Sequence, residues 1–262
     1  MITSRCGRLI HLDKAWIHSD PWGAYRLVLL AARFDMAIAT DTVELIKSVD
    51  FTRLDKGHIF PELSKLLLSE RPSQGLRYMF RCGILKQVHP LLFALVGCRQ
   101  EESHHPEGDA FQHTLLVVEQ CRKRLQDSAH PLVLMWAALL HDIGKPATTA
   151  YHKGKLTAYG HDVAGSRLAV SFLTELKAPP EVVNAVQQLV REHMQPVLLY
   201  KQKDKVSDRA IRRLLARVDI KELLLLSEAD YTGRGITRDY QPIKNWLCRR
   251  IEQLQMPGAD KS

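Results

Sequence analysis

Apolar residues recur at helical spacing along almost the whole chain, and this periodicity restricts the fold more than any other feature of the sequence. No stretch alternates apolar and polar residues for long enough to predict a strand. The segment that begins at Asp20 and Pro21 is typical, because an acidic cap and a first-turn proline precede the apolar run AYRLVLLAARF. The sequence therefore predicts an all-α protein.

Breaks in the periodicity divide the chain into a small helical region over residues 1–98, a bundle of longer helices over 99–235, and a C-terminal helix and tail over 236–262. In the first part we expect helices after Asp20, after a cap at Thr40, over 60–69, from Ser73 to about Cys82, and through ILKQVHPLLFALVG. Beyond the polar loop CRQEESHHPEGD we expect helices over 111–127, 131–143, 161–176, 180–193, 207–217, 219–231 and 238–254. A flexible loop, TTAYHKGKLTAYG, and a frayed tail, MPGADKS, complete the prediction.

Composition excludes several classes of protein. The longest apolar run, Leu132 to Leu140, is far shorter than the roughly 20 residues that cross a bilayer, and the N-terminus lacks the pattern of a secretory signal. Five scattered cysteines without a CxxC pair argue against a disulfide framework or a zinc knuckle. We expect a reduced, cytoplasmic protein without a membrane partner. The formal charge of +8 favours an anionic partner such as RNA or a nucleotide.

The doublet of His141 and Asp142 is the strongest chemical signal, because it follows nine apolar residues and so predicts polar groups delivered into the interior. A buried charge needs a partner, and a divalent metal satisfies an imidazole and a carboxylate together. These ligand types suit Mn, Fe, Co, Ni or Zn, and the carboxylate also suits Mg. Gly144 ends the helix, and Lys145 places a cation where it can hold a phosphate oxygen.

Four other ligand-type residues stand at comparable places in their helices. His113 lies in a first turn, Asp230 closes KELLLLSEAD, His161 opens a helix and His193 closes one. A lone histidine on a helix is more often a core or surface residue, but the ordered set across successive helices favours a metal site. We expect one ion, or two ions bridged by Asp142, in the arrangement typical of metal phosphohydrolysis.

Weaker signals surround this set. His105 and Glu107 are predicted at the rim as substrate-binding residues, with Glu107 or Asp109 as an alternative holder of a histidine ligand, although a solvated turn fits the pattern equally. Asp162 is predicted to pass a proton to the leaving group, or it is simply a carboxylate favoured at a helix start. The basic run KQKDKVSDRAIRRLLAR is read as a solvated face rather than a phosphate-steering one.

At these residues the chain resembles a known family. The stretches HHPEGDAFQHTLLVVEQ, AALLHDIGKPATT, GHDVAGSRLA and VREHM are similar to the HD domain at the C-terminus of bacterial tRNA nucleotidyltransferases, the multifunctional CCA-adding proteins. DPWGAYRLVLLAARFDMAIATDTVELI resembles that family's neck, and HIFPELSKLLLSERPSQGLRYMFRCGIL resembles its body, so the similarity covers roughly residues 18–235. The resemblance implies an HD-type, metal-dependent phosphohydrolase of 2′,3′-cyclic phosphates, 2′-nucleotides and simple phosphate esters. The matching metal ligands are His113, His141, Asp142 and Asp230.

The resemblance does not extend to the family's nucleotidyltransferase head, since only 19 residues precede Asp20-Pro21 and no two aspartates are separated by one residue. We therefore expect no CCA addition by this chain alone. The first hypothesis is hydrolysis of nucleotides or RNA ends with Mg, Mn, Ni or Co, in which Asp142, Lys145 and Asp162 are catalytic. The alternatives are a catalytically idle scaffold that binds tRNA or a partner, and an HD hydrolase of another nucleotide phosphate.

Overall fold

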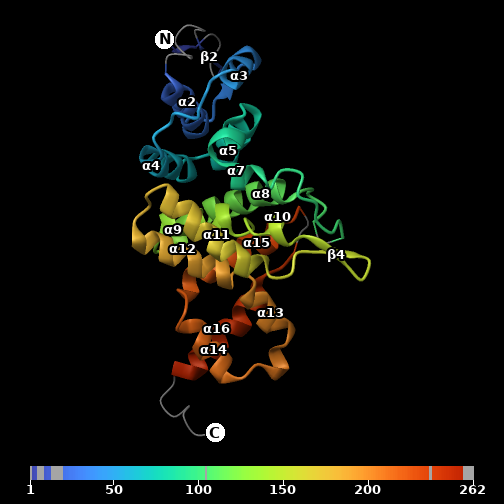
Figure 1. Cartoon of the computed structure of the whole chain (residues 1–262). Helices are drawn as coiled ribbons and strands as arrows, with labels where there is room; N and C mark the ends of the chain where they lie inside the picture. Colours follow the sequence, from blue (N-terminus) through green and yellow to red (C-terminus); the bar gives the residue numbers. More distant parts are fainter. Residues whose placement is uncertain (1, 5–8, 13–19, 104, 236–237, 256–262) are drawn as a thin grey trace.

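The computed structural model describes residues 2–4, 9–12, 20–103, 105–235 and 238–255. The described chain is predominantly helical, as the periodicity predicts, with two small β elements (Figure 1). The predicted frayed tail, residues 256–262, lies outside the described residues. Within those residues, no helix is both long and apolar enough to cross a bilayer.

The N-terminal part consists of short helices and a three-stranded sheet. The strands are β1 (Ile2–Ser4), β2 (Leu9–Leu12) and β3 (Ala37–Ile38); β2 pairs antiparallel with β1 and parallel with β3. The helices are α2 (Pro21–Arg33), α3 (Thr40–Lys47), α4 (Lys56–Leu67), α5 (Pro72–Arg81), α6 (Ile84–Val88) and α7 (Pro90–Phe93). Strands of two to four residues are too short to show an alternating pattern, so the sequence did not predict this sheet.

Side-chain caps explain where two of these helices begin. Asp20 accepts a hydrogen bond from a backbone N–H of the first turn of α2, as predicted. The prediction that Thr40 caps α3 was wrong, because Ala39 occupies the N-cap and Thr40 is the first helical residue. Asp55 caps α4, so that helix begins at Lys56 rather than residue 60.

The run ILKQVHPLLFALVG, predicted to be helical, is divided into α6 and α7 at His89. His89 has φ −128° and ψ 62°, outside the helical region. The ring of Pro90 disfavours helical geometry in the residue before it, which accounts for the break.

The rest of the chain supplies the central bundle and a C-terminal group. The bundle comprises α8 (Ala110–Lys123), α9 (Pro131–Leu140), α10 (Lys145–Thr148), α11 (His161–Glu175), α12 (Pro180–Glu192) and α15 (Ile220–Thr232). The C-terminal group comprises α13 (Gln195–Lys201), α14 (Asp208–Leu215) and α16 (Gln241–Gln255). Single turns of 3₁₀-helix cover Leu125–Asp127 and Lys203–Lys205. In Figure 1, α15 lies in the bundle although its neighbours in sequence lie below it.

The segment predicted as a flexible loop after α10 contains an antiparallel hairpin of β4 (Ala150–His152) and β5 (Lys155–Thr157). Its two-residue turn has positive φ at both Lys153 (50°) and Gly154 (78°). Positive φ at both central residues is the geometry of the type I′ turn, which matches the twist of the flanking strands. A lysine-glycine turn between such short strands gave too weak a sequence signal.

One hydrophobic core runs from α2 through the bundle to α15. Trp136 of α9, fully buried, stacks on Phe60 of α4 with ring centroids 5.3 Å apart, and its indole N–H donates to Ser64 at 3.0 Å. A second, smaller core joins α13, α14 and α16 to one face of α15. The N-terminal part and the bundle therefore share packing, and the predicted boundaries at 98 and 235 stay predictions.

We expect His89 to make the fold acid-sensitive. His89 is fully buried, with Nε2 3.1 Å from the Tyr25 hydroxyl, and burial lowers its pKa to about 3. The unfolded state then binds one more proton than the folded state between pH 6.5 and 3, so stability falls as the pH falls through that window. Urea unfolding at pH 7 and pH 5 measures the difference, and His89→Gln should lose about 2 kcal/mol less than wild type between them. Equal losses in both proteins contradict the assignment.

Candidate metal centre

The end of α9 delivers two ionisable side chains into the core. Every residue from Leu134 to Leu140 is buried, and His141 and Asp142 follow with exposed fractions of 0% and 1%. An apolar helix is stabilised by burial on all sides, so the residues at its end are carried inside with it. The prediction that this doublet lies in the interior is confirmed.

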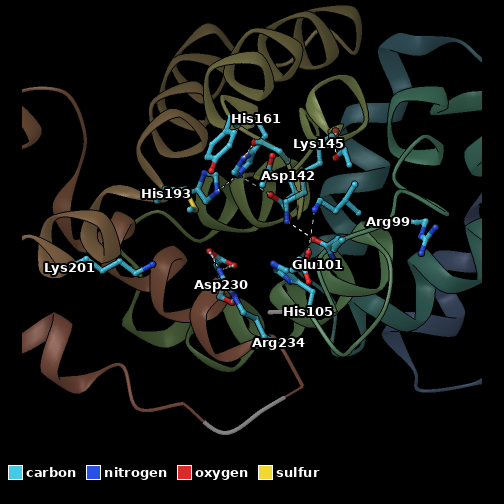
Figure 2. A pocket seen from close by; sticks show the side chains of 17 residues that line it. Arg99, Glu101, His105, Asp142, Lys145, His161, His193, Lys201, Asp230 and Arg234 are labelled. Atoms are coloured by element: carbon cyan, nitrogen blue, oxygen red, sulfur yellow. Dashed lines mark hydrogen bonds and ion pairs between the residues drawn. The ribbon is translucent and has the colours of Figure 1, made fainter. Parts of the chain in front are cut away.

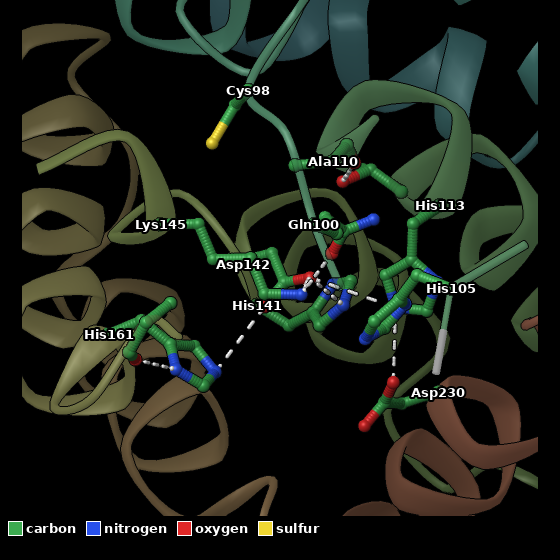
Figure 3. Close-up of polar contacts among 12 residues, drawn as sticks. Cys98, Gln100, His105, Ala110, His113, His141, Asp142, Lys145, His161 and Asp230 are labelled. Carbon is green, nitrogen blue, oxygen red and sulfur yellow. Dashed lines mark hydrogen bonds and ion pairs between the residues drawn. The ribbon is translucent and has the colours of Figure 1, made fainter. Parts of the chain in front are cut away.

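Four further elements bring the other predicted ligands to the same place (Figures 2 and 3). His113 stands in the first turn of α8, and Asp230 near the end of α15; both are buried. His161 is the first residue of α11, and His193 directly follows α12. Residues more than a hundred positions apart thus meet around Asp142.

The two oxygens of Asp142 face two different groups of nitrogen atoms. Oδ2 lies 3.2 Å from Nε2 of His141 and 3.6 Å from Nε2 of His113. Oδ1 lies 3.4 Å from Nε2 of His161, which itself lies 3.4 Å from Nε2 of His193. In each group all ligand atoms lie within 4.8 Å of one another, and Asp142 belongs to both. This is the arrangement expected for two ions that share one carboxylate.

Asp230 joins the first group through His113, since its Oδ1 lies 3.0 Å from Nε2 of His113. Arg234, one helical turn further along, contacts both oxygens of Asp230 at 3.1 and 3.2 Å. The predicted set of His113, His141, Asp142 and Asp230 is therefore contiguous in space.

Backbone carbonyls fix the tautomer of three of the histidines. Nδ1 of His141, His161 and His193 lies 2.8, 2.7 and 2.7 Å from the carbonyl oxygen of the residue three positions earlier. A carbonyl oxygen only accepts hydrogen bonds, so each Nδ1 carries the proton and each Nε2 presents a lone pair. The three lone pairs point toward Asp142 rather than away from it.

A carboxylate orients the fourth histidine. Oε1 of Glu107 lies 2.8 Å from Nδ1 of His113 and 2.8 Å from Nδ1 of His105. The side chain of Glu107 is only 3% exposed. From this position Glu107 fixes the orientation of the His113 ring. This role was the predicted alternative to substrate binding.

Two features of the cluster are explained by a bound cation but not by contacts within the protein. Nε2 of His141 is fully buried, with no hydrogen-bond partner among the described residues. The Nε2 atoms of His161 and His193 face each other although both rings carry their protons on Nδ1. Two nitrogen ligands of one ion lie about 3.0 to 3.4 Å apart, given metal–nitrogen distances of about 2.1 Å. The donor set of imidazoles and carboxylates therefore fits a divalent metal.

Both carboxylates are ionised at neutral pH. Burial alone would raise the pKa of Asp142, but its interactions with His141 and with the ammonium group of Lys145 lower that pKa well below its usual range. Burial likewise acts on Asp230, where Arg234 outweighs it and lowers the pKa. Ionised carboxylates are the form that binds a metal.

The histidines differ in their proton affinity. Burial, and after it the neighbouring His161, lower the pKa of His193 to about 4, so the ring is neutral at pH 7. Burial also acts to lower the pKa of His113, but hydrogen bonds with Asp230 and Glu107 raise it above its usual value. An ion that binds Nε2 of His113 must therefore displace a proton, and its affinity should fall in acid.

The cluster opens into a cavity of about 300 Å³ (Figure 2). Asp142, His161, His193 and Asp230 line it, together with four cationic side chains. These are Arg99, Lys145, Lys201 and Arg234. Lys145 lies 2.6 Å from Oδ2 of Asp142, as expected from its sequence position. A cavity that combines metal-ligand groups with cations suits a phosphate-bearing ligand.

The remaining predicted site residues have different outcomes. His105 lines the cavity. Glu107 does not line it, and Asp109 instead caps α8 by accepting from Gln112 N–H at 2.9 Å. Asp162 is half-buried and does not line the cavity, so its role in proton transfer stays a prediction.

Sequence reasoning missed three residues at the site. Arg234 stands four residues after Asp230, a helical spacing that pairs opposite charges and could have been noticed. Lys201 belongs to the basic run that was read as a solvated face. Gln100, which accepts from Lys145 at 2.5 Å, lies in an irregular loop without any periodic signal.

Gly144 lets two backbone segments meet beside the cluster. A Cβ atom at this position would lie 2.2 Å from the carbonyl oxygen of His161 and 2.5 Å from the nitrogen of Gly165. Such contacts are too short for any side chain, although the backbone angles of Gly144 suit every residue. The glycine therefore allows α11 to bring His161 up to Asp142.

Comparisons with known proteins agree with this description. Residues 110–235 match the HD domain, and residues 35–95 match the region described as the probable RNA and SrmB-binding site of polymerase A. The multifunctional CCA protein of Azoarcus sp. (strain BH72) is 33% identical over 251 residues, which are 90% of this chain and 58% of that protein. That of Verminephrobacter eiseniae (strain EF01-2) is 30% identical over 260 residues, or 94% and 60%. The chain spans about half the length of the curated relatives it matches.

Solved structures share the fold. A CCA-adding enzyme in complex with CTP gives a TM-score of 0.58 at 12% identity, covering 97% of this chain and 52% of that one. A tRNA nucleotidyltransferase complexed with a primer tRNA and an ATP analogue gives 0.56 at 15% identity, covering 95% and 63%. At this level of identity the likeness concerns the fold alone.

We expect Gly144→Ala to weaken metal binding by separating α11 from α9. The added methyl group should cost about 1 to 3 kcal/mol of folding free energy, as overpacking does, and lower Mn²⁺ affinity about 10- to 100-fold. Calorimetric titration of the metal-free protein measures the affinity, and urea unfolding the stability. Gly57→Ala is the matched control, because its Cβ would meet mainly the flexible end of Lys177. If both variants bind Mn²⁺ like wild type, the close approach does not hold the site together.

Proposed function

Because residues 110–235 are an HD domain joined to an RNA-binding region of the polymerase A type, we propose that this chain is a divalent-metal-dependent phosphohydrolase. Its proposed substrates are nucleotides or RNA ends that carry a 2′,3′-cyclic phosphate or a 2′-phosphate. The observation that carries the proposal is the convergence of Nε2 atoms from His113, His141 and His161 on the two oxygens of Asp142.

In this proposal His113, His141, Asp142 and Asp230 hold one ion, and His161 and His193 complete a second with Asp142. A bound divalent ion supplies positive charge that activates water and neutralises a phosphate group. The protein's contribution is to orient the ligands before any ion arrives and to keep His141, His161 and His193 with a free Nε2. The carbonyl-anchored Nδ1 atoms and the buried Glu107 support that role.

Cationic side chains bind the phosphate in the same proposal. Lys145 reaches the cluster from one side, and Arg234 reaches it through Asp230. Arg99 and Lys201 also line the cavity, and their charged groups make no ion pair or hydrogen bond with the described residues. Unpaired cations at a cavity wall attract an anionic substrate and orient its phosphate oxygens.

A second candidate function is RNA binding without hydrolysis. The match of residues 35–95 to an RNA-binding region and the formal charge of +8 favour it. A gel shift with tRNA in EDTA tests it, because phosphate contacts by lysine and arginine do not need a divalent metal. Binding that survives EDTA in a protein that hydrolyses nothing would support this candidate over the first.

We expect hydrolysis of 2′,3′-cyclic AMP and of bis-p-nitrophenyl phosphate with at least one of Mg²⁺, Mn²⁺, Co²⁺ or Ni²⁺. EDTA should abolish turnover, and the same metal should restore it. Asp142→Asn should reduce kcat by at least about 1,000-fold, since one carboxylate serves both groups of ligands. Circular dichroism controls for folding. No turnover with any of the four metals contradicts the proposal.

We expect Lys145→Met to separate metal binding from catalysis. The variant loses the ammonium group that would face the phosphate, so kcat should fall about 100-fold, in the range seen when one charge-stabilising donor is removed. Its Mn²⁺ affinity should match or exceed that of wild type, because Lys145 no longer competes for Asp142. Lys123→Met, on an exposed turn of α8, is the control. A parallel loss of affinity and kcat would mean that Lys145 only maintains the fold of the site.

A further inference from the structure

Two aromatic side chains beside the cavity are unusually exposed. Tyr159 is 74% exposed and Tyr151 is 70% exposed, the highest values among the large hydrophobic residues that the structure describes. Both belong to residues 150–160, here named the rim hairpin, which contains β4 and β5. Rings this exposed are not stabilised by packing in the core, so they are candidates for contact with a ligand.

The rim hairpin forms one wall of the cavity. Leu156, Thr157, Ala158 and Tyr159 line the cavity that contains the metal-ligand cluster. The next residue but one after Tyr159 is His161, a member of that cluster. Beyond the wall, the hairpin projects away from the helical body (Figure 1). The rim hairpin is therefore in position to contact the part of a ligand that extends out of the cavity on this side.

Local contacts hold the rim hairpin in place. The backbone N–H of Leu156 donates to a carboxylate oxygen of Glu101 at 3.3 Å, which ties β5 to the loop before α8. The rings of His152 and Tyr159 meet edge to face, with centroids 5.8 Å apart and planes at 88°. An aromatic pair fixed in this way loses little conformational entropy when a flat ring stacks on it.

The charged side chains of the rim hairpin itself are positive. It contains Lys153 and Lys155 but no aspartate or glutamate. The side chains of Lys153 and Lys155 are exposed. The two tyrosines flank the two lysines along the hairpin. Exposed aromatic rings together with cations are the groups by which proteins bind single-stranded nucleic acid, because the rings stack on bases and the cations contact the phosphates.

The size of the cavity limits what fits inside it. A volume of about 300 Å³ lies at the lower end for ligand pockets and holds about one nucleotide. Any nucleotides attached to that one must lie outside, where the rim hairpin stands. A mononucleotide would leave Tyr151 and both hairpin lysines without a role in binding.

We propose that the rim hairpin binds the single-stranded 3′ end of an RNA, whose terminal phosphate enters the cavity. The inference rests on the proposed hydrolysis, and it names an RNA end rather than a free nucleotide as the substrate. Tyr159 stacks on a base at the mouth of the cavity, and Tyr151 stacks on a base further out. Lys153 and Lys155 contact the phosphates between them. RNA is favoured over DNA because 2′,3′-cyclic and 2′-phosphates require a ribose.

The test compares the KM values of wild-type and variant forms of the whole chain for a mononucleotide and for an oligonucleotide. The substrates are 2′,3′-cyclic AMP and a fluorescein-labelled adenosine hexamer that ends in a 2′,3′-cyclic phosphate. Tyr151→Ala and Lys153→Ala/Lys155→Ala should each raise the KM for the hexamer about tenfold more than the KM for the mononucleotide. Tyr151→Phe is the matched control, because it keeps the stacking ring and should behave like wild type. Circular dichroism checks that each variant folds.

Binding of the labelled hexamer, measured by fluorescence anisotropy, separates this inference from the proposed hydrolysis. If the wild type binds the hexamer and the alanine variants bind it about tenfold more weakly, the rim hairpin binds RNA even if no turnover is seen. If the wild type hydrolyses both substrates but the variants change both KM values equally, the substrate is a free nucleotide and the inference is wrong. Failure of wild type to bind the hexamer also overturns it.

Discussion

Asp142 is an ionised carboxylate in the centre of a helical bundle, at 1% exposure, and the arrangement around it follows from that burial. Removal of a carboxylate from water costs several kcal/mol unless positive or hydrogen-bonding groups replace the water. Here Lys145 on α10 supplies a positive charge, and Nε2 atoms of His113, His141 and His161 surround the carboxylate at 3.2 to 3.6 Å. The same charge that makes the bundle costly to fold without partners is the charge that makes it able to hold an ion.

The sequence predicts this cluster better than its surroundings, and the reason is physical. His141 and Asp142 follow an apolar run whose burial is certain, so their location in the interior follows from local sequence. The surroundings depend on contacts between distant segments, which periodicity does not encode. Gln100 and the β4–β5 hairpin are of this kind, because Lys145 and Glu101 contact them from other segments. Arg234 differs, since its partner Asp230 is only four residues away. The error at Thr40 is also local, because the N-cap is Ala39, one residue earlier.

The shared core links the two regions that the family comparisons distinguish. Phe60 and Ser64 belong to the region that matches an RNA-binding site, and Trp136 belongs to the region that matches the HD domain, yet Trp136 contacts both of the other side chains directly. Close packing transmits small displacements, because a filled core has few empty spaces to absorb them. The orientation of α9, and with it the doublet at its end, is therefore set partly by the N-terminal helices.

Backbone carbonyl oxygens, which no side-chain substitution removes, orient three of the clustered histidines. The acceptors for His141, His161 and His193 are the carbonyl oxygens of Ala138, Ala158 and Val190. Any residue at those three positions offers the same carbonyl oxygen, so a side-chain substitution leaves the acceptor in place, whatever it does to the packing of Ala138 and Val190 in the core. Only a change to the backbone itself, such as an ester in place of an amide, would alter the acceptor strength. The orientation of these three imidazole rings therefore depends on the main chain rather than on the side chains at the acceptor positions.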